Sequence, residues 1–307
     1  MIFALIVFII IVLFLFVVMC FFSMAFVKHD IGNVDNIDDK LNKPLFKYRD
    51  IVKQGMDYIE SSDYKWVETL SFDGLKLKAR YYDNGSKNTI LLFHGYRSSA
   101  KRDFSCAVEM YADFGLNVLL CDQRSHGESE GKLITFGVKE SRDVISWIEF
   151  VMEKYSPEKL VLDGISMGAT TVILACGHNL PDNVKAVIAD CGFTSPSDIM
   201  KKVAKQSFKI NAGFFIPFLD MACRIIGKFS FKDVSIKKAL EKSKIPVLFI
   251  HGLADGFVPC EMSKTGYEYA PKGSKLLLVP DADHGLSFLV DTAKVKGAVR
   301  EFLKENL

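Results

Sequence analysis

Three residues far apart in the sequence carry the side chains of a nucleophile, a general base and a carboxylate: Ser166, His284 and Asp255. A serine hydroxyl attacks a carbonyl poorly until a neutral imidazole accepts its proton. The imidazole in turn needs a carboxylate that fixes its tautomer and stabilises its cation. Each of the three residues follows an apolar run typical of a strand, in the order Ser, Asp, His. This order predicts that they meet at one edge of a parallel sheet.

The serine lies in the pentapeptide Gly164-Ile165-Ser166-Met167-Gly168. A nucleophile on a tight turn from strand to helix adopts a strained backbone, and flanking glycines remove the side chains that would clash. The same turn directs the first N–H groups of the new helix at developing negative charge. The pattern G-x-S-x-G is common by chance. Its position between a predicted strand and a predicted helix is what indicates a nucleophilic serine.

The sequence leaves other roles open for these residues. A serine at a helix start can be a simple cap, and His284 can be an ordinary structural histidine. Asp190 ends the preceding strand and Asp283 is adjacent to His284, so either could take the place of the favoured carboxylate, Asp255.

The rest of the chain contains the elements that would position these groups. Continuous apolar runs alternate with helical patterns, which indicates a parallel sheet buried on both faces. About 277 residues follow the first thirty, a length that suits one large domain. The predicted strands are Trp66–Phe72, Leu75–Tyr82, Thr89–Phe93, Val118–Cys121, Leu160–Asp163, Ala186–Ala189, Val247–Ile250 and Leu276–Val279. The predicted helices are Ala100–Phe114, Val138–Tyr155, Met167–Cys176, Glu261–Tyr269 and Asp291–Leu303.

From Tyr64 to the C-terminus the chain resembles the α/β-hydrolase superfamily, in particular its branch of esterases, monoglyceride lipases and serine-aminopeptidase-like enzymes. The matching residues are His94-Gly95-Tyr96, the segment Asp122-Gln123-Arg124-Ser125-His126-Gly127-Glu128-Ser129, the Ser166 pentapeptide, Asp255 and His284. The resemblance implies a mostly parallel, twisted sheet with helices on both faces. It also implies an oxyanion hole made by the backbone N–H groups of Tyr96 and Met167, and a helical lid formed by residues 194–244.

One position departs from the family pattern. The family usually has D-x-R-G-H-G-x-S after the fourth strand, and Ser125 replaces its first glycine. This loop is normally structural, so we expect little effect on catalysis. Asp122 and Arg124 are most simply interpreted as an ion pair that fixes the loop.

The sequence gives no reason to expect a metal or an organic cofactor. The seven cysteines form no C-x-x-C pair and no Cys/His cluster at zinc spacing. His94, His126 and His251 each precede a glycine at a strand exit, but their distant positions lack ligand spacing. We expect them to hydrogen-bond loops.

The first 27 residues predict a membrane anchor. Ile2 to Val27 contains no charged residue, and Ser23 is its only conventionally polar one. A helix of this length runs roughly 39 Å, which crosses a hydrocarbon core of about 30 Å with some tilt. A cleaved secretory signal ending near Ala25 is the alternative. The apolar run is longer than the usual signal, however, and no Lys or Arg precedes it.

Basic residues follow this segment, and counted alone they place the domain on the cytoplasmic side. They are Lys28, Lys40, Lys43, Lys47, Arg49 and Lys53. Residues 28–60 are interpreted as a polar linker and a first helix, and residues 61–307 as the hydrolase domain. Because no chemically competent group lies in the leader, deletion of Met1–Val27 is expected to leave an active soluble domain.

The formal net charge of +2 gives no reason to propose nucleic acid as a partner. Pro196–Lys244, however, carries a net charge of +7 among many Phe and Ile residues. The structural interpretation is a helical cap with a solvated basic face. The functional interpretation is a surface that binds anionic headgroups and lipid-like chains.

Together these features predict a membrane-tethered serine hydrolase that cleaves a carboxylic ester, with small-molecule and lipid-like esters as the candidate substrates. A serine peptidase or amidase would use the same groups, and an inactive binding protein of the same fold is the third alternative. The intact set of Ser166, Asp255 and His284 argues against the inactive protein.

Overall fold

The centre of the molecule is a sheet of eight strands in the order β1-β2-β4-β3-β5-β6-β7-β8. The strands are β1 (Lys65–Leu70), β2 (Lys76–Tyr82), β3 (Asn88–Phe93), β4 (Asn117–Cys121), β5 (Lys159–Ile165), β6 (Val184–Asp190), β7 (Val247–Gly252) and β8 (Lys275–Val279). β2 pairs antiparallel with β1 and β4, whereas every other neighbouring pair is parallel. Each predicted strand overlaps one of these. The computed structural model describes residues 1–30, 32–38, 40–209, 211–232 and 234–307.

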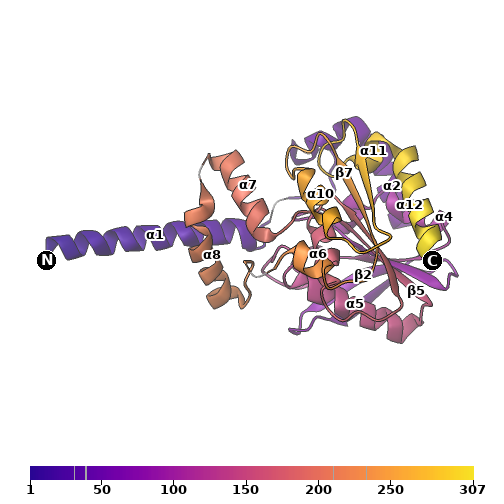
Figure 1. Ribbon diagram of the computed structural model, residues 1–307, viewed down its shortest axis with the longest axis horizontal. Coiled ribbons are helices and arrows are strands. Elements are labelled where there is room, and N and C mark those ends of the chain that lie inside the picture. The colour runs from indigo at the N-terminus through magenta and orange to yellow at the C-terminus, as the bar shows by residue number, and fades with distance from the viewer. Residues whose placement is uncertain (31, 39, 210, 233) are drawn as a thin grey trace.

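Helices cover both faces of this sheet (Figure 1). They are α1 (Ile2–Phe26), η1 (Lys40–Tyr48), α2 (Arg49–Ser61), α3 (Ala100–Asp103), α4 (Ala107–Asp113), α5 (Glu140–Tyr155), α6 (Met167–Ala175), α7 (Pro196–Phe208), η2 (Ala212–Phe214), α8 (Ile216–Ala222), η3 (Cys223–Gly227), α9 (Ile236–Leu240), α10 (Glu261–Glu268), α11 (Ser287–Val290) and α12 (Thr292–Asn306). α5, α6 and α9 pack on one face, and α2, α4 and α12 on the other. All the residues of β4 are therefore buried, which explains its continuous apolar sequence.

The single helix predicted over Ala100–Phe114 is wrong, because the chain divides into α3 and α4. α2 packs directly on the break between them. A Cβ atom on Gly55 of α2 would lie 2.1 Å from the carbonyl oxygen of Ser105. The close backbone approach thus occurs where the helix is interrupted.

The ion pair predicted between Asp122 and Arg124 is also wrong. The buried guanidinium of Arg124 donates to Asp143 at 2.5 and 2.6 Å and to Asp73 at 3.1 and 3.0 Å. Asp122 accepts the N–H of Glu128 at 3.0 Å instead. Arg124 therefore joins the loop after β4 to α5 and to the turn between β1 and β2, with the two-pronged geometry that suits a guanidinium.

The loop after β4 also explains why glycine suits the position of Ser125. Its φ is 67°, in the left-handed region that favours glycine. The Ser125 hydroxyl donates to the Leu133 carbonyl at 2.9 Å, so the serine gains a hydrogen bond that glycine lacks.

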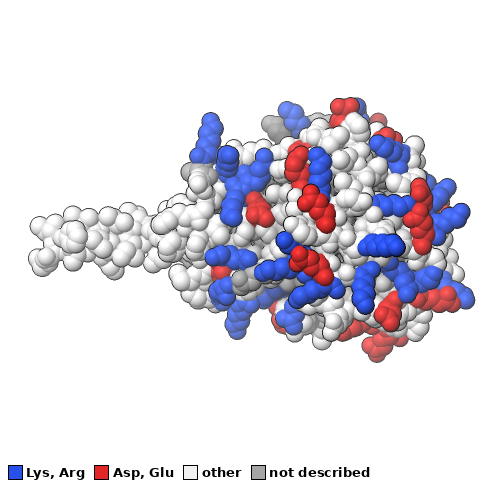
Figure 2. Space-filling model, in the orientation of Figure 1, with Lys and Arg blue, Asp and Glu red and all other residues white. Residues whose placement is uncertain are grey.

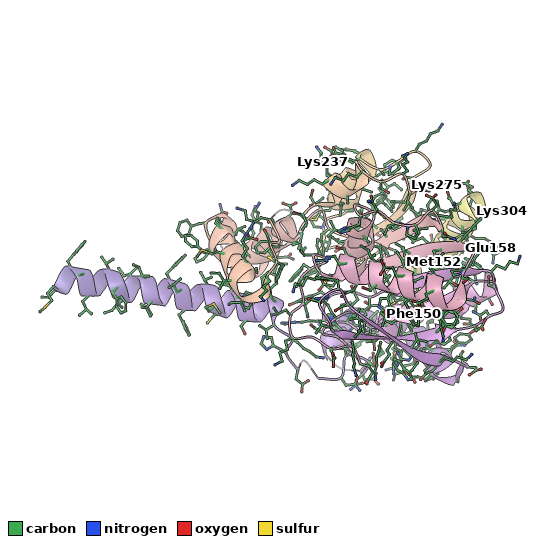
Figure 3. The ribbon with its side chains drawn as sticks, turned by 90° about the horizontal axis from the view of Figure 1, so that it is seen from below. Phe150, Met152, Glu158, Lys237, Lys275 and Lys304 are labelled. Atoms are coloured by element: carbon green, nitrogen blue, oxygen red, sulfur yellow. The ribbon has the colours of Figure 1, made fainter. Side chains whose placement is uncertain are left out.

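α1 extends away from the sheet, and α7 and α8 lie beside its C-terminal part in both ribbon views (Figures 1 and 3). Residues 2–13 of α1 are exposed, whereas Val18, Phe22 and Phe26 are buried. By length and composition α1 could cross a membrane, although a secretory signal would meet the same criterion. Glu158 and Lys304 mark the end of the domain opposite α1 (Figure 3).

Backbone hydrogen bonds tie the end of α1 to the domain. The N–H of Lys28 donates to the carbonyl of Lys132 at 2.8 Å, and the N–H of Ile134 donates to the carbonyl of Phe26 at 2.7 Å. The expected polar linker therefore begins with a fixed junction.

The helical segment between β6 and β7 divides into two parts. Phe193, Ile199, Ile216 and Leu219 form an apolar cluster with α1. α9 does not belong to this cluster, since Ile236, Ala239 and Leu240 are buried in the core beside the sheet. We call residues 196–232, which lie within the expected range 194–244, the helical insertion below.

Candidate active site

Ser166 lies on a strained turn between β5 and α6. Its φ of 55° and ψ of −112° fall outside the regions that a side chain normally allows. A Cβ atom on Gly164 would lie 2.2 Å from the carbonyl of Gly168, and one on Gly168 would lie 1.8 Å from the carbonyl oxygen of Phe93. Both positions therefore require glycine, because a Cβ atom would overlap the neighbouring backbone. This agrees with the reason that the sequence suggested for them.

The imidazole of His284 lies within hydrogen-bonding distance of both Ser166 and Asp255. Nε2 of His284 is 2.9 Å from Oγ of Ser166, and its Nδ1 is 2.7 Å from Oδ2 of Asp255. A carboxylate only accepts, so Nδ1 carries the proton and Nε2 is left to accept from the serine hydroxyl. This arrangement can remove a proton from Ser166.

The side chain of Asp255 is fully buried and is held by several donors. Its Oδ1 accepts the N–H groups of Phe257 and Val258 at 2.9 and 2.7 Å. Burial opposes its ionisation, but the hydrogen bonds from His251 and His284 hold its pKa well below the ordinary value. The carboxylate therefore stays charged beside the imidazole at neutral pH.

The other two carboxylates considered from the sequence have different partners. Oδ1 of Asp190 accepts the hydroxyl of Ser287 at 3.2 Å, and burial raises the pKa of Asp190 to about 6. Oδ1 of Asp283 accepts the backbone N–H groups of Gly256 and His284 at 3.1 and 2.8 Å. Among the three candidates, the His284 ring bonds Asp255.

Tyr96 and Met167 both lie next to the nucleophile. Met167 is the first residue of α6. Tyr96 follows Gly95, where a Cβ atom would lie 3.5 Å from Cβ of Ser166. The N–H of Gly95 donates to Asp103 at 2.8 Å, which holds this loop in position.

A metal ion has one conceivable set of ligands within the described residues: Cys191, Asp255 and His284, whose donor atoms lie within 4.8 Å of one another. Metal ions bind the thiolate form of cysteine. Cys191 is fully buried, and burial raises its pKa well above the ordinary value. The His284 nitrogens already have partners in Asp255 and Ser166. The residues present therefore suit proton transfer better than a metal.

The three His-Gly pairs hold loops, as expected. Nε2 of His94 accepts the N–H of Gln123 at 3.1 Å, and Nε2 of His126 accepts the N–H of Arg97 at 3.0 Å. His251 has an additional role that its sequence context did not reveal.

Nε2 of His251 lies 2.9 Å from the Val258 carbonyl and 3.2 Å from Oδ2 of Asp255. Both oxygens are acceptors, so Nε2 carries the proton and Nδ1 accepts from Ser263 at 2.7 Å. His251 thus donates a second imidazole hydrogen bond to Asp255. In the sequence, only the position of His251 four residues before Asp255 could have indicated this hydrogen bond.

Two cavities border Ser166. The larger, about 630 Å³, is lined by His284 and Asp283 and extends to the buried carboxylates of Asp163 and Asp190. The smaller, about 320 Å³, is lined largely by apolar side chains of α1, α7 and α8. Among the described residues, those lining the smaller cavity do not include His284.

The comparisons with known proteins agree with this fold. Residues 84–233 match the hydrolase family described as "Serine aminopeptidase, S33". The uncharacterized protein YqkD of Bacillus subtilis is 27% identical over 217 residues, which are 70% of this chain and 71% of that protein. Thiohydrolase AneE of Aspergillus aculeatus is 31% identical over 138 residues, which are 43% and 42% of the two chains.

Among solved structures, the esterase Pf2001 of Pyrococcus furiosus superimposes with a TM-score of 0.65 at 27% identity. The match covers 80% of this chain and 92% of that esterase. The region without a counterpart is thus a minor part of the molecule. The fold, the family match and the esterase neighbour agree that this chain is an enzyme that belongs to the α/β-hydrolase superfamily.

Proposed function

We propose that this hydrolase cleaves carboxylic esters through an acyl-enzyme formed on Ser166. The observation that carries the proposal is the continuous hydrogen-bonded series from Oγ of Ser166 through His284 to Asp255, at 2.9 and 2.7 Å. These distances are suitable for proton transfer between a nucleophile and a general base.

In the first half of the reaction, Oγ of Ser166 bonds to the ester carbonyl carbon while its proton passes to Nε2 of His284. The backbone N–H groups of Tyr96 and Met167 stabilise the oxyanion. The C–O bond to the alcohol then breaks, and the imidazolium returns its proton to the departing alcohol oxygen. Asp255 stabilises the imidazolium and keeps its ring in place.

In the second half, a water molecule donates a proton to His284 and its oxygen attacks the acyl carbon. The bond to Oγ of Ser166 breaks, the serine recovers its proton, and the carboxylic acid leaves. No metal or organic cofactor is needed for either half.

An ester is the favoured substrate because the structural neighbour at 27% identity is an esterase and one cavity beside Ser166 is largely apolar. Amide cleavage is the second candidate, since residues 84–233 match a family described by a serine aminopeptidase. We also propose that α1 is retained as a membrane anchor, with the domain on the cytoplasmic side, because basic residues follow it.

The test uses the full-length protein in detergent with short-chain esters, monoacylglycerols and aminoacyl anilides. We expect ester turnover and labelling by a fluorophosphonate, and we expect Ser166→Ala to lose both, with a fall in kcat on the order of 10⁴–10⁶. Ser156→Ala is the matched control, because Ser156 is exposed and follows α5. Labelling of the Ser166→Ala variant would assign the nucleophile to another residue, and faster anilide than ester turnover would make the enzyme an amidase.

A further inference from the structure

α1 forms one wall of the smaller cavity beside Ser166. Its contribution comes from Val18, Phe21, Met24 and Ala25, and the helical insertion supplies the opposite wall. The volume of about 320 Å³ lies in the range of small-molecule sites. The nucleophile therefore borders an apolar cavity that the sequence did not predict.

The position of α1 is fixed by specific contacts with the active-site loop. The hydroxyl of Tyr96 donates to the carbonyl of Ala25 at 2.8 Å. The guanidinium of Arg97 donates to the carbonyls of Met24 and Val27 at 2.8 and 3.0 Å. These donors bond the last carbonyls of the helix, which have no partner within it.

Aromatic packing adds to these hydrogen bonds. The ring of Phe26 is fully buried and lies 5.5 Å from the rings of Phe136 and Phe229. Phe14 packs edge-on against Phe218 of α8 at 4.8 Å. α1 is thus built into the site along its C-terminal half.

The position of His284 indicates which half of an ester enters the apolar cavity. The departing alcohol must lie beside Nε2 of His284, which protonates it. His284 lines the larger, more polar cavity, and the smaller cavity borders Ser166 without it. The acyl group, which becomes bonded to Ser166, therefore extends toward α1.

We propose that the C-terminal part of α1 is one wall of an acyl-chain site, and that the substrate is a long-chain fatty acyl ester taken from the bilayer. This inference rests on the proposed esterase function. It makes the predicted anchor a part of substrate binding, in addition to a tether. Cleavage of a signal after Ala25 would remove that wall.

The length of the exposed part of α1 supports a supply from the membrane. Residues 2–13 are exposed and span about 18 Å as a helix, less than a hydrocarbon core of about 30 Å. A spanning α1 therefore brings part of the helical insertion to membrane depth. The insertion presents suitable side chains there: Phe214, Met221, Ile225 and Ile226 are 67%, 47%, 72% and 47% exposed.

The experiment compares two substitutions of the same type on α1, in the full-length protein reconstituted in neutral lipid vesicles. Ala25→Phe places a ring at the cavity wall, and Ala4→Phe is the control because Ala4 is exposed on the distal part of the helix. The readout is the ratio of kcat/KM for methyl hexadecanoate to that for methyl acetate. Fluorophosphonate labelling counts the active sites in each variant.

Ala25→Phe should lower this ratio about 15-fold for every two methylene groups that lose their place, because each buried methylene contributes about fourfold. Ala4→Phe should leave the ratio unchanged. Ala204→Phe, on the α7 wall of the same cavity, should reproduce the fall. Hexadecyl acetate, whose long chain is in the alcohol, should be insensitive to both cavity substitutions.

Distinct results would overturn the inference. An unchanged ratio in both Ala25→Phe and Ala204→Phe, or a selective loss with hexadecyl acetate, would remove the acyl chain from this cavity. So would an intact mass that lacks the first 25 residues. Failure of the wild type to hydrolyse methyl acetate, methyl hexadecanoate and the short ester panel would instead contradict the proposed function itself.

Discussion

The sheet edge around Ser166 and the helical insertion beside α1 are in contact, yet they are stabilised in different ways. At the sheet edge, backbone geometry and hydrogen bonds fix each group: two glycines leave no room for a Cβ atom, and Asp255 has donors from two imidazoles and two backbone N–H groups. The insertion and α1 are joined mainly by aromatic rings, such as Phe14, Phe218 and Phe229.

These two modes of stabilisation differ in how well they tolerate substitutions. Backbone contacts and buried hydrogen bonds lose their geometry after a change of a single atom, because an unpaired buried group is costly. Apolar side chains pack without direction, so the size of a cavity can change while the packing persists. The sheet edge is therefore suited to conserving a reaction, and the insertion to varying its substrate.

The largest effect that this comparison predicts is at Asp255. Asp255→Asn should lower kcat by about 10⁴, because an amide can donate to His284 and so stabilise the wrong imidazole tautomer. Asp190→Asn is the matched substitution at the neighbouring strand end, and it should cost far less, since Asp190 bonds Ser287 rather than His284. The measurement is kcat on a short-chain ester. If Asp190→Asn were the more damaging change, the carboxylate would have been assigned to the wrong strand.

A smaller but still large effect is expected on stability at Gly168. A Cβ atom there would lie 1.8 Å from the Phe93 carbonyl oxygen, a backbone atom that cannot turn away. Gly168→Ala should therefore lower the free energy of unfolding by about 3 kcal/mol or more. Gly297→Ala on α12 is the control, because nothing lies within 4 Å of its added Cβ. It should stabilise the helix by about 0.5–1 kcal/mol.

Thermal unfolding of the full-length protein in detergent, followed by circular dichroism, compares these two alanine variants. Equal melting temperatures for Gly168→Ala and wild type would show that the turn can relax, and the contrast between the two regions would then be lost.

The smallest effect concerns charge on the insertion. Basic side chains gather on it beside α1, which itself carries none (Figure 2). We propose that they attract anionic headgroups, each contributing about 1 kcal/mol near the surface. Replacement of Lys201, Lys202 and Lys205 with Gln should weaken binding to anionic vesicles at low salt, with unchanged turnover of a small soluble ester.

This binding experiment requires a shortened chain. Deletion of Met1–Val27, as the sequence suggested, would remove Phe22 and Phe26 from the apolar cluster with the insertion. Deletion of residues 2–13 instead removes only exposed residues. Equal affinity for neutral and anionic vesicles, or no dependence on salt, would leave the basic face as an ordinary solvated surface.

Local patterns in the sequence predicted the strands and the groups that follow them. Parallel strands bring their carboxyl ends to one edge, so the meeting of Ser166 and His284 followed from the order of elements. The partners of Arg124 could not be predicted in this way. Asp73 and Asp143 come from segments 51 and 19 residues distant, and only the tertiary fold brings them to the loop.

The docking of α1 was hidden for a different reason. A helix that is apolar on all sides has no stripe to indicate which face contacts protein. Val18 and Phe22 are buried while Val17 and Phe16 are exposed, although the same residue types occur on both faces. The wall that α1 contributes to the cavity therefore becomes apparent only once the folded domain is present.

The short backbone ladder that joins Phe26 and Lys28 to the domain leaves no slack between α1 and the catalytic centre. With α1 in a bilayer, the opening of the active site would keep a constant height above the midplane. The enzyme would then meet esters by lateral diffusion within the leaflet. Its rate would follow the mole fraction of substrate in the membrane, and inert lipid would lower it by surface dilution even at a fixed bulk concentration.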